Sequence, residues 1–587
     1  MIIEALVSQY DYLMKNKKTN DLSLLEYGYT PEKFGCSIHL TSNGEFIGIL
    51  DERDNKEPRF KKAPANCNKT SGIKSNYLYD NLEYVLGLEK SNKPFTEYIE
   101  QRIISINDNK EINIAKTKKS LSKQKAFIDN LGNSKEEMII KDFLINKGSN
   151  INFFNDSDLL ILTSHDFNIE FYIDGNRVLE NELINEYWLK KKEEEKSDII
   201  KKCLICNKEN PIAKLHPPIK GAGFEKATPK LISYNFDSVQ KHDNQGTLNS
   251  PICEDCVHKY TQMLNYLVSS PNNHFKIDDL LIVYFCREKE NEEFFHKTMK
   301  LRKNRNQADE KTINELFKRG LNYATDFNIN LNSTFYIIGI TANGARLSIQ
   351  FFHKDNFGKI LENMINYYNS TTHETKEGFY YPDIRDIADI PNYKKNGEKL
   401  ERIRDSKILK EDLLKLYKHI ILGKPFPSRI FKITLNKIMN DGIITSTRKS
   451  VLLNHCLYKK EDKEYNMDNI KSKAYYLGQL LMLIEATQIE ASDSNLNTTI
   501  GNKYLNIFLR TPQLGFIQTM KFQKIYMSKL TQKNKSYAIN KDKLIQDTLN
   551  NLGNHIPEKF NNSEKAEFLL GYCNKSILYQ NNKEKGE

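Results

Sequence analysis

Two Cys-x-x-Cys pairs in the middle of the chain constrain its fold more than any other feature. They are Cys203-Leu-Ile-Cys206 and Cys253-Glu-Asp-Cys256, with 46 residues between them. One such turn brings two thiolates to an ion at about 2.3 Å, and two turns complete a closed tetrahedral site. Four thiolates favour zinc or an iron–sulfur cluster over metals that prefer harder ligands. We therefore expect these cysteines to hold a structural zinc ion that stabilises a loop-rich insertion over residues 203–256.

The remaining cysteines do not suggest a disulfide framework. The total of nine is odd, and the chain opens on MIIEALVSQYDYLM, an amphipathic helix pattern without the basic start of a signal peptide. No apolar run approaches the roughly 18 residues of a membrane span. We therefore expect a soluble, cytoplasmic protein without a disulfide framework.

Hydrophobic periodicity predicts an α+β fold. Segments that alternate around Asn-Gly turns predict β-hairpins over 37–50 and 334–352. The runs 159–164 and 169–175 are predicted to be strands, and residues 95–145 are predicted to be mainly helical. From about residue 400 onward, Leu and Ile at helical spacing dominate, which predicts an all-helical C-terminal bundle.

These patterns divide the chain into four expected parts. An N-terminal α+β domain with β-hairpins covers residues 1–202, and a charge run at 190–202 marks its end. The zinc-knuckle insertion follows at 203–256. A second α+β segment then covers 257–400, and a helical domain covers 401–587.

The basic residues are concentrated in the last of these parts. Residues 401–587 contain 31 Lys and Arg against 19 Asp and Glu, whereas the first 400 residues contain 56 against 57. A concentrated positive field is what a polyanion-binding surface requires. Solvated helix faces give the same count, so charge alone leaves both interpretations open.

An enzymatic interpretation of the cysteine-bounded segment competes with the structural one. Some HNH nucleases carry two zinc knuckles, with a catalytic His between them and an Asn before the second pair. His216, Asn249 and His258 lie at comparable positions, but Leu215 precedes His216 where such sites have His or Asp. Walker, His-Glu-x-x-His and nucleophile-elbow motifs are absent. We expect a non-enzyme in which His216 is hydrogen-bonded in a turn, with a zinc-dependent HNH-like nuclease as the alternative.

Several segments combine, in order and spacing, into the pattern of one family. They are KTSGIKSNYLYDNLEYVLGLE (69–89), CLIC followed by LHPPIKGAGF and LISYNFDS, FYIIGITANGARLSIQFF (335–352), ILGKPFPSRIF (421–431), and AYYLGQLLMLIEATQ with LNTTIGNKYL (496–505). On these segments the chain resembles the large subunit of the type I-C CRISPR effector complex, Cascade. The resemblance runs from residue 1 to about residue 535.

The resemblance implies a non-catalytic subunit of an RNA-guided surveillance complex. Such a subunit contacts the short motif that flanks the target (the PAM), helps to open the duplex and stabilise the R-loop, and presents DNA to a recruited helicase–nuclease. Pairing with the guide RNA reads the sequence. The implied partners are guide RNA, double- and single-stranded target DNA, the backbone, guide 5′-end and small subunits, and the helicase–nuclease. A zinc-stabilised RNA-binding scaffold without target recognition is a further alternative.

The resemblance also selects a loop for contact with DNA. Thr70, Ser71, Lys74 and Asn76 match the family's Arg-Thr-Ser-Gly-x-x-Asn-like segment, with Lys69 where the family usually has Arg. Hydroxyls and backbone N–H groups at a helix start suit phosphate, and Asn or Lys can reach base edges. The alternative is an N-cap followed by a turn. Many relatives lack the second cysteine pair, which implies that the zinc site belongs to a sub-lineage and is structural.

In this family a separate small subunit resembles the large subunit's own C-terminus and is produced from an internal start. Met467 to Glu587 spans 121 residues, and Met439 is an alternative start. The basic excess then fits a bundle that lines the path of displaced single-stranded DNA. The expected phosphate contacts are Lys521, Lys524, Lys529, Lys533 and Lys535, with a weaker patch at Arg448 and Lys449. We expect Phe522, Ile525, Tyr526 and Leu530, at helical spacing on the same segment, to form a core stripe.

Overall fold

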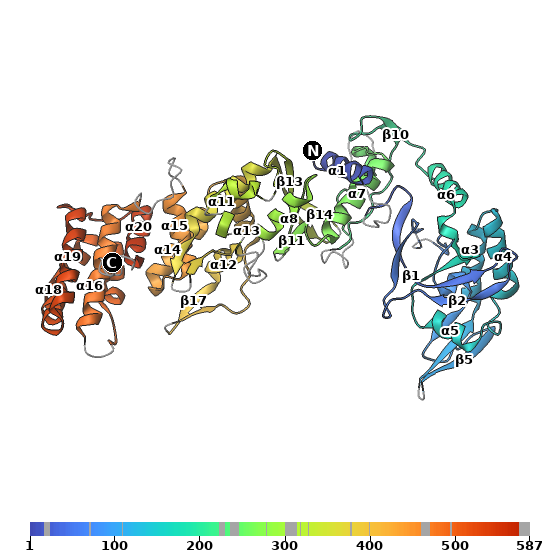
Figure 1. The fold of residues 1–587 in the computed structure, drawn as a ribbon, viewed down its shortest axis with the longest axis horizontal. Coiled ribbons are helices and arrows are strands. Elements are labelled where there is room, and N and C mark those ends of the chain that lie inside the picture. The colour runs from blue at the N-terminus through green and yellow to red at the C-terminus, as the bar shows by residue number, and fades with distance from the viewer. Residues whose placement is uncertain are drawn as a thin grey trace. The chain divides into compact units, whose positions relative to one another are not determined.

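The computed structural model divides into two compact units, residues 1–269 with 343–347 and residues 270–342 with 348–587 (Figure 1). The residues that the structure describes are 1–16, 24–67, 69, 72–107, 110–221, 229–234, 246–277, 279–299, 311, 314–316, 319–326, 328–344, 346–375, 378–397, 399–458, 470–492 and 496–574. Among the helices of these ranges, none combines the length and apolarity that a bilayer span requires.

The first unit mixes helices with short sheets. Its elements are α1 (Ile2–Lys15), β1 (Tyr29–Leu40), β2 (Phe46–Asp51), β3 (Arg59–Pro64), α2 (Leu82–Val85), β4 (Glu89–Ser91), β5 (Glu100–Asn107), β6 (Lys110–Lys116), α3 (Lys118–Asn130), α4 (Lys135–Phe143), α5 (Asp156–Thr163), β7 (Asn168–Ile173), β8 (Asn176–Arg177), α6 (Glu182–Glu194), β9 (Ile200–Lys202), β10 (Glu209–Pro211) and α7 (Glu254–Ser269).

The long strand β1 organises the first unit. Its second half pairs antiparallel with β2, as predicted for the hairpin over 37–50, and its first half pairs antiparallel with β3. It also pairs in parallel with β7, which places Ile38 beside Phe171. Both side chains are at most 1% exposed, and this sheet forms the core together with α2 to α6.

Two local predictions in this unit were wrong. Residues 159–164 lie mostly in the helix α5, because the Asn155 side chain accepts from the backbone N–H of Asp158 and caps a helix that buries Leu159 and Leu162. A short apolar run is compatible with a strand or a helix, and here the N-cap at Asn155 favours the helix. Residues 95–145 begin with the antiparallel pair β5–β6 before the helices α3 and α4.

The second unit begins with a sheet and ends in helices. Its elements are β11 (His274–Ile277), β12 (Leu280–Phe285), α8 (Lys289–Met299), α10 (Leu321–Thr325), β13 (Thr334–Asn343), β14 (Arg346–Asn356), α11 (Phe357–Thr371), β15 (His373–Thr375), β16 (Gly378–Tyr380), α12 (Ile384–Asp389), β17 (Tyr393–Asn396), β18 (Lys399–Arg402), α13 (Lys410–Leu422), α14 (Ser428–Asp441), α15 (Ser446–Leu457), α16 (Lys473–Ala491), α17 (Ile500–Arg510), α18 (Pro512–Lys533), α19 (Lys535–Leu552) and α20 (Asn562–Cys573).

The sheet of the second unit has the order β11-β12-β13-β14, and its β13–β14 pair is the predicted hairpin over 334–352. All six residues of β12 are buried, so both faces of the sheet are covered. From α13 onward every element that the structure describes is a helix, as predicted. The α+β class and the helical C-terminal region are thereby confirmed.

Helix α16 is the centre of the C-terminal bundle, where α17, α18, α19 and α20 all contact it (Figure 1). It crosses α20 at Gly478 and Gly571. A Cβ atom at Gly478 would lie 1.9 Å from the Phe568 carbonyl oxygen, and one at Gly571 would lie 2.0 Å from the Tyr475 carbonyl oxygen. Only glycine at both positions allows the two backbones to approach this closely. Met467 lies outside the described residues, and Met439 lies in α14.

Candidate metal centre and nucleic-acid interface

The four cysteines of the two pairs converge on one point in the first unit. Their sulfur atoms all lie within 4.8 Å of one another, and the Sγ atoms of Cys206 and Cys253 are 3.8 Å apart. Four sulfurs at about 2.3 Å from a tetrahedral ion would be separated by about 3.8 Å. Cys203, Cys253 and Cys256 are each 1% exposed. The cluster can therefore hold a metal ion, as the spacing of the cysteines predicted.

Backbone and amide donors surround the sulfur atoms. Cys203 Sγ accepts from the N–H groups of Ile205 at 3.4 Å and Cys253 at 3.3 Å, and Asn210 Nδ2 lies 3.6 Å from Cys206 Sγ. Hydrogen bonds from the side chain and the backbone N–H of Cys256 lower the pKa of the Cys253 thiol, and the same contact raises the pKa of the Cys256 thiol. Donors aimed at sulfur stabilise the thiolate form, which is the form that binds metal.

Helix α7 connects the cysteine cluster to the start of the chain. It begins directly after Cys253 and carries Cys256 in its first turn. Glu254, between the two ligands, accepts hydrogen bonds from the Tyr27 hydroxyl at 2.9 Å and from the Ser197 N–H at 2.9 Å. The helix therefore binds one segment that precedes the N-terminal sheet in the sequence and one that follows it. The same helix positions a metal ligand.

The next turn of α7 holds α1 (Figure 1). His258 Nε2 donates to the Leu25 carbonyl at 3.1 Å, and the Tyr10 hydroxyl donates to the same oxygen at 2.6 Å. Lys259 pairs with Asp11 at 3.0 Å. The metal ligands and the anchors of the N-terminal helix thus occupy consecutive turns of one helix.

The residues of the nuclease alternative have other partners. His216 is 2% exposed and its Nδ1 lies 2.6 Å from the Tyr260 hydroxyl, so it is hydrogen-bonded as expected. His258 lies two residues before Tyr260, on roughly the opposite face of α7. Asn249 Nδ2 donates to the Gly246 carbonyl at 2.8 Å. These three side chains do not converge on one open site.

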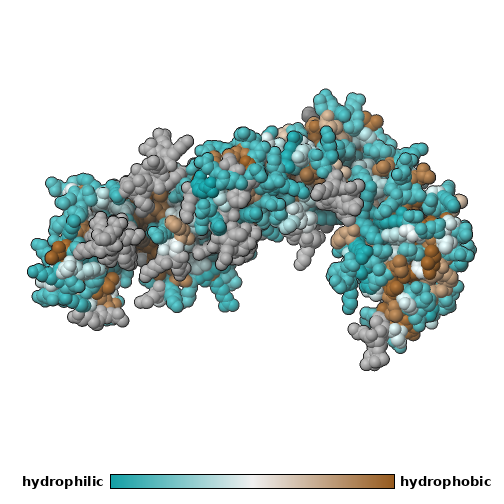
Figure 2. Space-filling model, viewed as in Figure 1, coloured by the Kyte–Doolittle hydropathy of each residue, from teal (hydrophilic) through white to brown (hydrophobic). Residues whose placement is uncertain are grey.

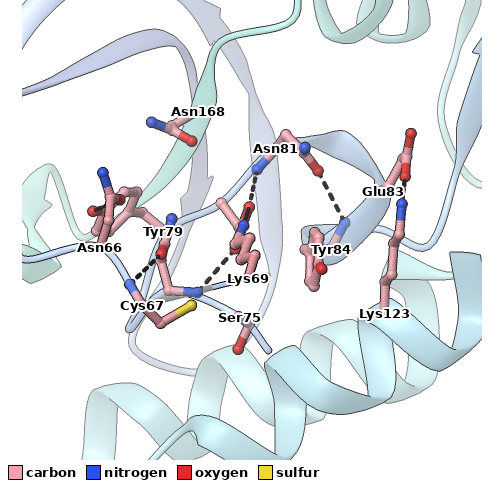
Figure 3. A network of polar contacts seen from close by, with 12 residues as sticks. Asn66, Cys67, Lys69, Ser75, Tyr79, Asn81, Glu83, Tyr84, Lys123 and Asn168 are labelled. Atoms are coloured by element: carbon pink, nitrogen blue, oxygen red, sulfur yellow. Dashed lines mark hydrogen bonds and ion pairs between the residues drawn. The ribbon is translucent and has the colours of Figure 1, made fainter. Parts of the chain in front are cut away.

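Asp80 organises the loop that was predicted to face DNA. Its carboxylate accepts from Lys69 Nζ at 2.6 and 2.7 Å and from the N–H groups of Asn76 and Asn81, each at 2.9 Å (Figure 3). Lys69 Nζ also lies 4.1 Å from the centre of the Tyr84 ring. Lys69 is therefore tied to a buried carboxylate of its own chain. Thr70 and Ser71 lie outside the described residues.

A cavity of about 630 Å³ opens beside this loop. Lys74, an exposed residue of the loop, lines it, and Lys191 and Lys192 of α6 line it as well. The other polar residues of its lining are Asn66, Ser75, Asn76 and Asn130. The carboxylates of Asp129 and Glu195 also line it, and Glu195 pairs with Lys192 at 2.6 Å. Ammonium and amide groups around one cavity can bind phosphate and the polar edges of bases.

Asn76 lies deeper than the sequence suggested. It is 5% exposed and lines the cavity, and its Oδ1 already accepts from the Cys67 N–H at 3.1 Å. Lys191 Nζ donates to Asn130 Oδ1 at 2.9 Å. Sequence reasoning missed Lys191 and Lys192 as lining residues, because it treated the charge run at 190–202 only as a domain boundary.

The predicted patch at Arg448 and Lys449 is not a surface patch. Arg448 has a side chain that is 2% exposed and donates to both carboxylate oxygens of Asp441 at 2.8 Å. Its guanidinium is therefore unavailable to a phosphate, and we withdraw it as a nucleic-acid contact. Lys449 is half-buried, and burial lowers its pKa.

The lysines of 521–535 lie on the surface of α18 and at the start of α19. Lys521, Lys524, Lys529, Lys533 and Lys535 are all exposed, and Lys533 Nζ donates to the Ser492 carbonyl at 3.1 Å. Figure 2 shows a mostly hydrophilic surface over these C-terminal helices. Phe522 and Tyr526 pack on the core and Leu530 is buried, as expected, but Ile525 is 50% exposed, which contradicts its place in the core stripe.

A model of a known protein family matches almost the whole chain. No curated protein matches the sequence. A family model described as CRISPR-associated protein (Cas_Csd1) matches residues 6–577, which include the cavity, the cysteine cluster and the C-terminal helices. The chain therefore belongs to the Cas_Csd1 family of CRISPR-associated proteins.

Proposed function

We propose that this chain is the non-catalytic large subunit of a type I-C CRISPR surveillance complex, where it recognises the motif that flanks the target. The observation that carries the proposal is the family match over residues 6–577. In this role the chain aids duplex opening and R-loop stabilisation and presents DNA to a recruited helicase–nuclease. Guide RNA pairing reads the target itself.

The cavity beside the Asp80-organised loop supports motif recognition in the first unit. Lys74 is exposed at the cavity, and Asn76 lies inside it. An ammonium group there can position a phosphate or donate a hydrogen bond to a base edge, while an internal amide can pair only with a group that enters the cavity. The Asp80 carboxylate fixes the loop before DNA arrives, which lowers the entropy lost on binding.

We further propose that the ion of the cysteine cluster is zinc and that its role is structural. Four thiolates leave no position for a water molecule or a substrate, so the site has no place for hydrolytic chemistry. His216 and His258 are engaged in hydrogen bonds elsewhere. Both features support a non-enzymatic chain whose metal stabilises α7 and the segments around it.

Replacement of Lys74 by alanine should reduce the preference of the assembled complex for duplexes that carry the flanking motif. A base or positioning contact contributes about 1–3 kcal/mol of discrimination, so the affinity ratio between duplexes with and without the motif should fall roughly 5- to 100-fold. Gel shifts with the two duplexes measure this ratio. Lys119→Ala is the matched control, because it removes the same charge from an exposed position at the far end of α3.

An unchanged ratio in Lys74→Ala would remove the loop from motif recognition. Equal binding of both duplexes by the wild-type complex would instead favour an RNA-binding scaffold. Nicking of DNA by the purified chain with a divalent metal, abolished in His216→Ala, would establish the nuclease alternative and contradict the proposed function.

We also propose that the lysines of α18 line the path of displaced single-stranded DNA. Substitution of Lys521, Lys524 and Lys529 by alanine should weaken binding to all sequences alike and flatten its salt dependence. The slope of log K against log salt should fall by up to about 2, at roughly 0.7 for each phosphate contact on a single strand. Titrations at several salt concentrations measure the slope. Loss of Lys359, Lys415 and Lys432, exposed on α11, α13 and α14, is the charge-matched control and should leave the slope within error.

A further inference from the structure

The strands β17 and β18 form a basic hairpin, which we define as residues 393–407. This segment contains six Lys and Arg against three Asp and Glu. The register pairs Tyr393 with Arg402 and Lys395 with Leu400, and it pairs Lys394 with Glu401. Because opposed residues of an antiparallel pair share a face, Lys395 and Arg402 lie on one face of the hairpin and Lys394 and Glu401 on the other.

The face that carries Lys395 and Arg402 is fixed to the body of the second unit. Lys395 Nζ donates to the Asp441 carbonyl at 2.9 Å, at the end of α14. Arg402 donates to both carboxylate oxygens of Asp389, at 2.8 and 3.2 Å. Lys437 of α14 donates to the Tyr393 carbonyl. Both strands are therefore anchored, one to α14 and the other to the end of α12.

Arg448 holds in place Asp441, the residue of α14 to which Lys395 is bound. Its guanidinium holds the carboxylate of Asp441 with two hydrogen bonds and also donates to the Ile443 carbonyl at 2.7 Å. The same Asp441 presents its carbonyl to Lys395. Arg448, which sequence reasoning assigned to nucleic acid, is thus a positioning residue for the hairpin.

The opposite face of the hairpin and the segment that follows β18 carry cations that remain available. Lys394, Lys399, Arg404 and Lys407 are exposed, and within the described part of the structure none of their side chains makes a hydrogen bond or an ion pair. Glu401, which pairs with Lys394 across the strands, accepts from Asn396 Nδ2 at 2.8 Å. The hairpin therefore holds four free cations on a backbone that is already fixed.

We propose that the basic hairpin binds the phosphate backbone of duplex DNA through Lys394, Lys399, Arg404 and Lys407. A two-stranded β-ribbon has the dimensions of a groove of B-DNA, and its anchored backbone loses little entropy on binding. The guanidinium of Arg402 is occupied by Asp389 and adds no contact of its own. We expect the four exposed cations to bind mainly phosphate, which receives most of the hydrogen bonds in protein–DNA interfaces. This contact is separate from the cavity and does not depend on the flanking motif.

The test is a variant in which Lys394, Lys399, Arg404 and Lys407 are all alanine, measured in the assembled complex on duplexes without the motif. Binding at about 0.1 M salt should weaken tenfold or more, and the salt slope should fall by about 2–4, at roughly 0.9 for each phosphate contact. A variant with alanine at Lys297, Lys359, Lys415 and Lys432 removes the same charge from exposed helix positions and should change both quantities far less. Equal losses in the two variants, or a loss on single strands alone, would overturn the proposal.

A second variant separates geometry from total charge. Asp389→Asn removes a negative charge but also loosens the Arg402 anchor. A contact that depends on the fixed hairpin predicts weaker duplex binding, whereas a general electrostatic effect predicts tighter binding, which would overturn the proposal. The ratio between duplexes with and without the motif should stay unchanged in both hairpin variants. A failure of motif recognition, seen in that ratio, is therefore distinguishable from a failure of the hairpin contact, seen in the salt slope.

Discussion

Cys256→Ser should abolish metal binding and release the N-terminal helix α1 at the same time. Cys256 is 1% exposed in the first turn of α7, and a serine hydroxyl does not replace a thiolate as a ligand. Binding of a structural zinc ion supplies about 10–16 kcal/mol in small zinc-dependent modules, and this is folding free energy for the segment that holds it. The cysteine-bounded segment has few long apolar runs to compensate, so the start of α7 should lose its order.

The loss should spread to α1 because the next turn of α7 carries its anchors. His258 and Lys259 contact Leu25 and Asp11, so a disordered first turn removes the surface on which α1 packs. Metal content measured by mass spectrometry should fall from one ion per chain to none. Hydrogen exchange in residues 2–15 should become at least tenfold faster, while exchange in α16 stays slow.

Cys456→Ser is the control for this prediction. Cys456 is a half-buried cysteine of α15 outside the cluster, and its substitution should leave metal content and exchange in α1 unchanged. Slow exchange in α1 of the metal-free Cys256→Ser protein would show that α1 docks without the metal and would contradict the coupling through α7.

Gly478→Val should have the second large effect, on the stability of the second unit. The first added carbon would meet the Phe568 carbonyl oxygen at 1.9 Å and the Tyr572 nitrogen at 2.8 Å, and both are backbone atoms of α20 that no rotamer change can move. Overpacking typically destabilises a protein by about 1–3 kcal/mol. A clash between a side chain and a neighbouring backbone should cost at least the upper value of this range, because the backbone cannot move aside. We expect a loss of about 3 kcal/mol or more.

Thermal unfolding followed by circular dichroism measures this loss. For the second unit, residues 270–342 with 348–587, an unfolding entropy of about 2.1 cal/mol/K per residue makes 3 kcal/mol correspond to a decrease in Tm of roughly 5 °C. Gly48→Ala is the control, because a Cβ atom at Gly48 meets nothing within 4 Å and the position has no positive φ. A Tm of Gly478→Val within about 2 °C of the wild type would show that α16 and α20 can separate without a penalty.

The metal site could be predicted from the sequence because its geometry is mostly local. A Cys-x-x-Cys turn fixes two ligands by spacing alone, and only the meeting of Cys206 with Cys253 depends on the fold. The hairpins at 37–50 and 334–352 were equally local, since Asn-Gly turns determine them. The helix α5 was missed because the cap at Asn155, and not the apolar run after it, decided the structure.

The nucleic-acid residues could be predicted only in part, because burial depends on partners distant in sequence. Lys191 reaches the cavity from a helix that lies more than one hundred residues after the loop, and no spacing rule connects the two. Arg448 meets Asp441 across the glycine turn between α14 and α15, where a capped helix follows at Thr445. The Asn396-Gly397 turn between lysines was a readable hairpin signal that the sequence interpretation did not use.

The crossing of α16 and α20 has a consequence for any shorter product of the same gene. Gly478 and Gly571 both follow Met467, so a chain that starts there keeps the crossing whole. It loses α15, which contacts α20 in this chain and joins it through His455 Nε2 and Ser563 Oγ, 2.9 Å apart. The surface of α20 would then face water or a new neighbour. The same residues of α20 would then have to fit two environments, one packed on α15 and one without it. Substitutions on that side of α20 should therefore be tolerated less often than its burial in either product alone would suggest.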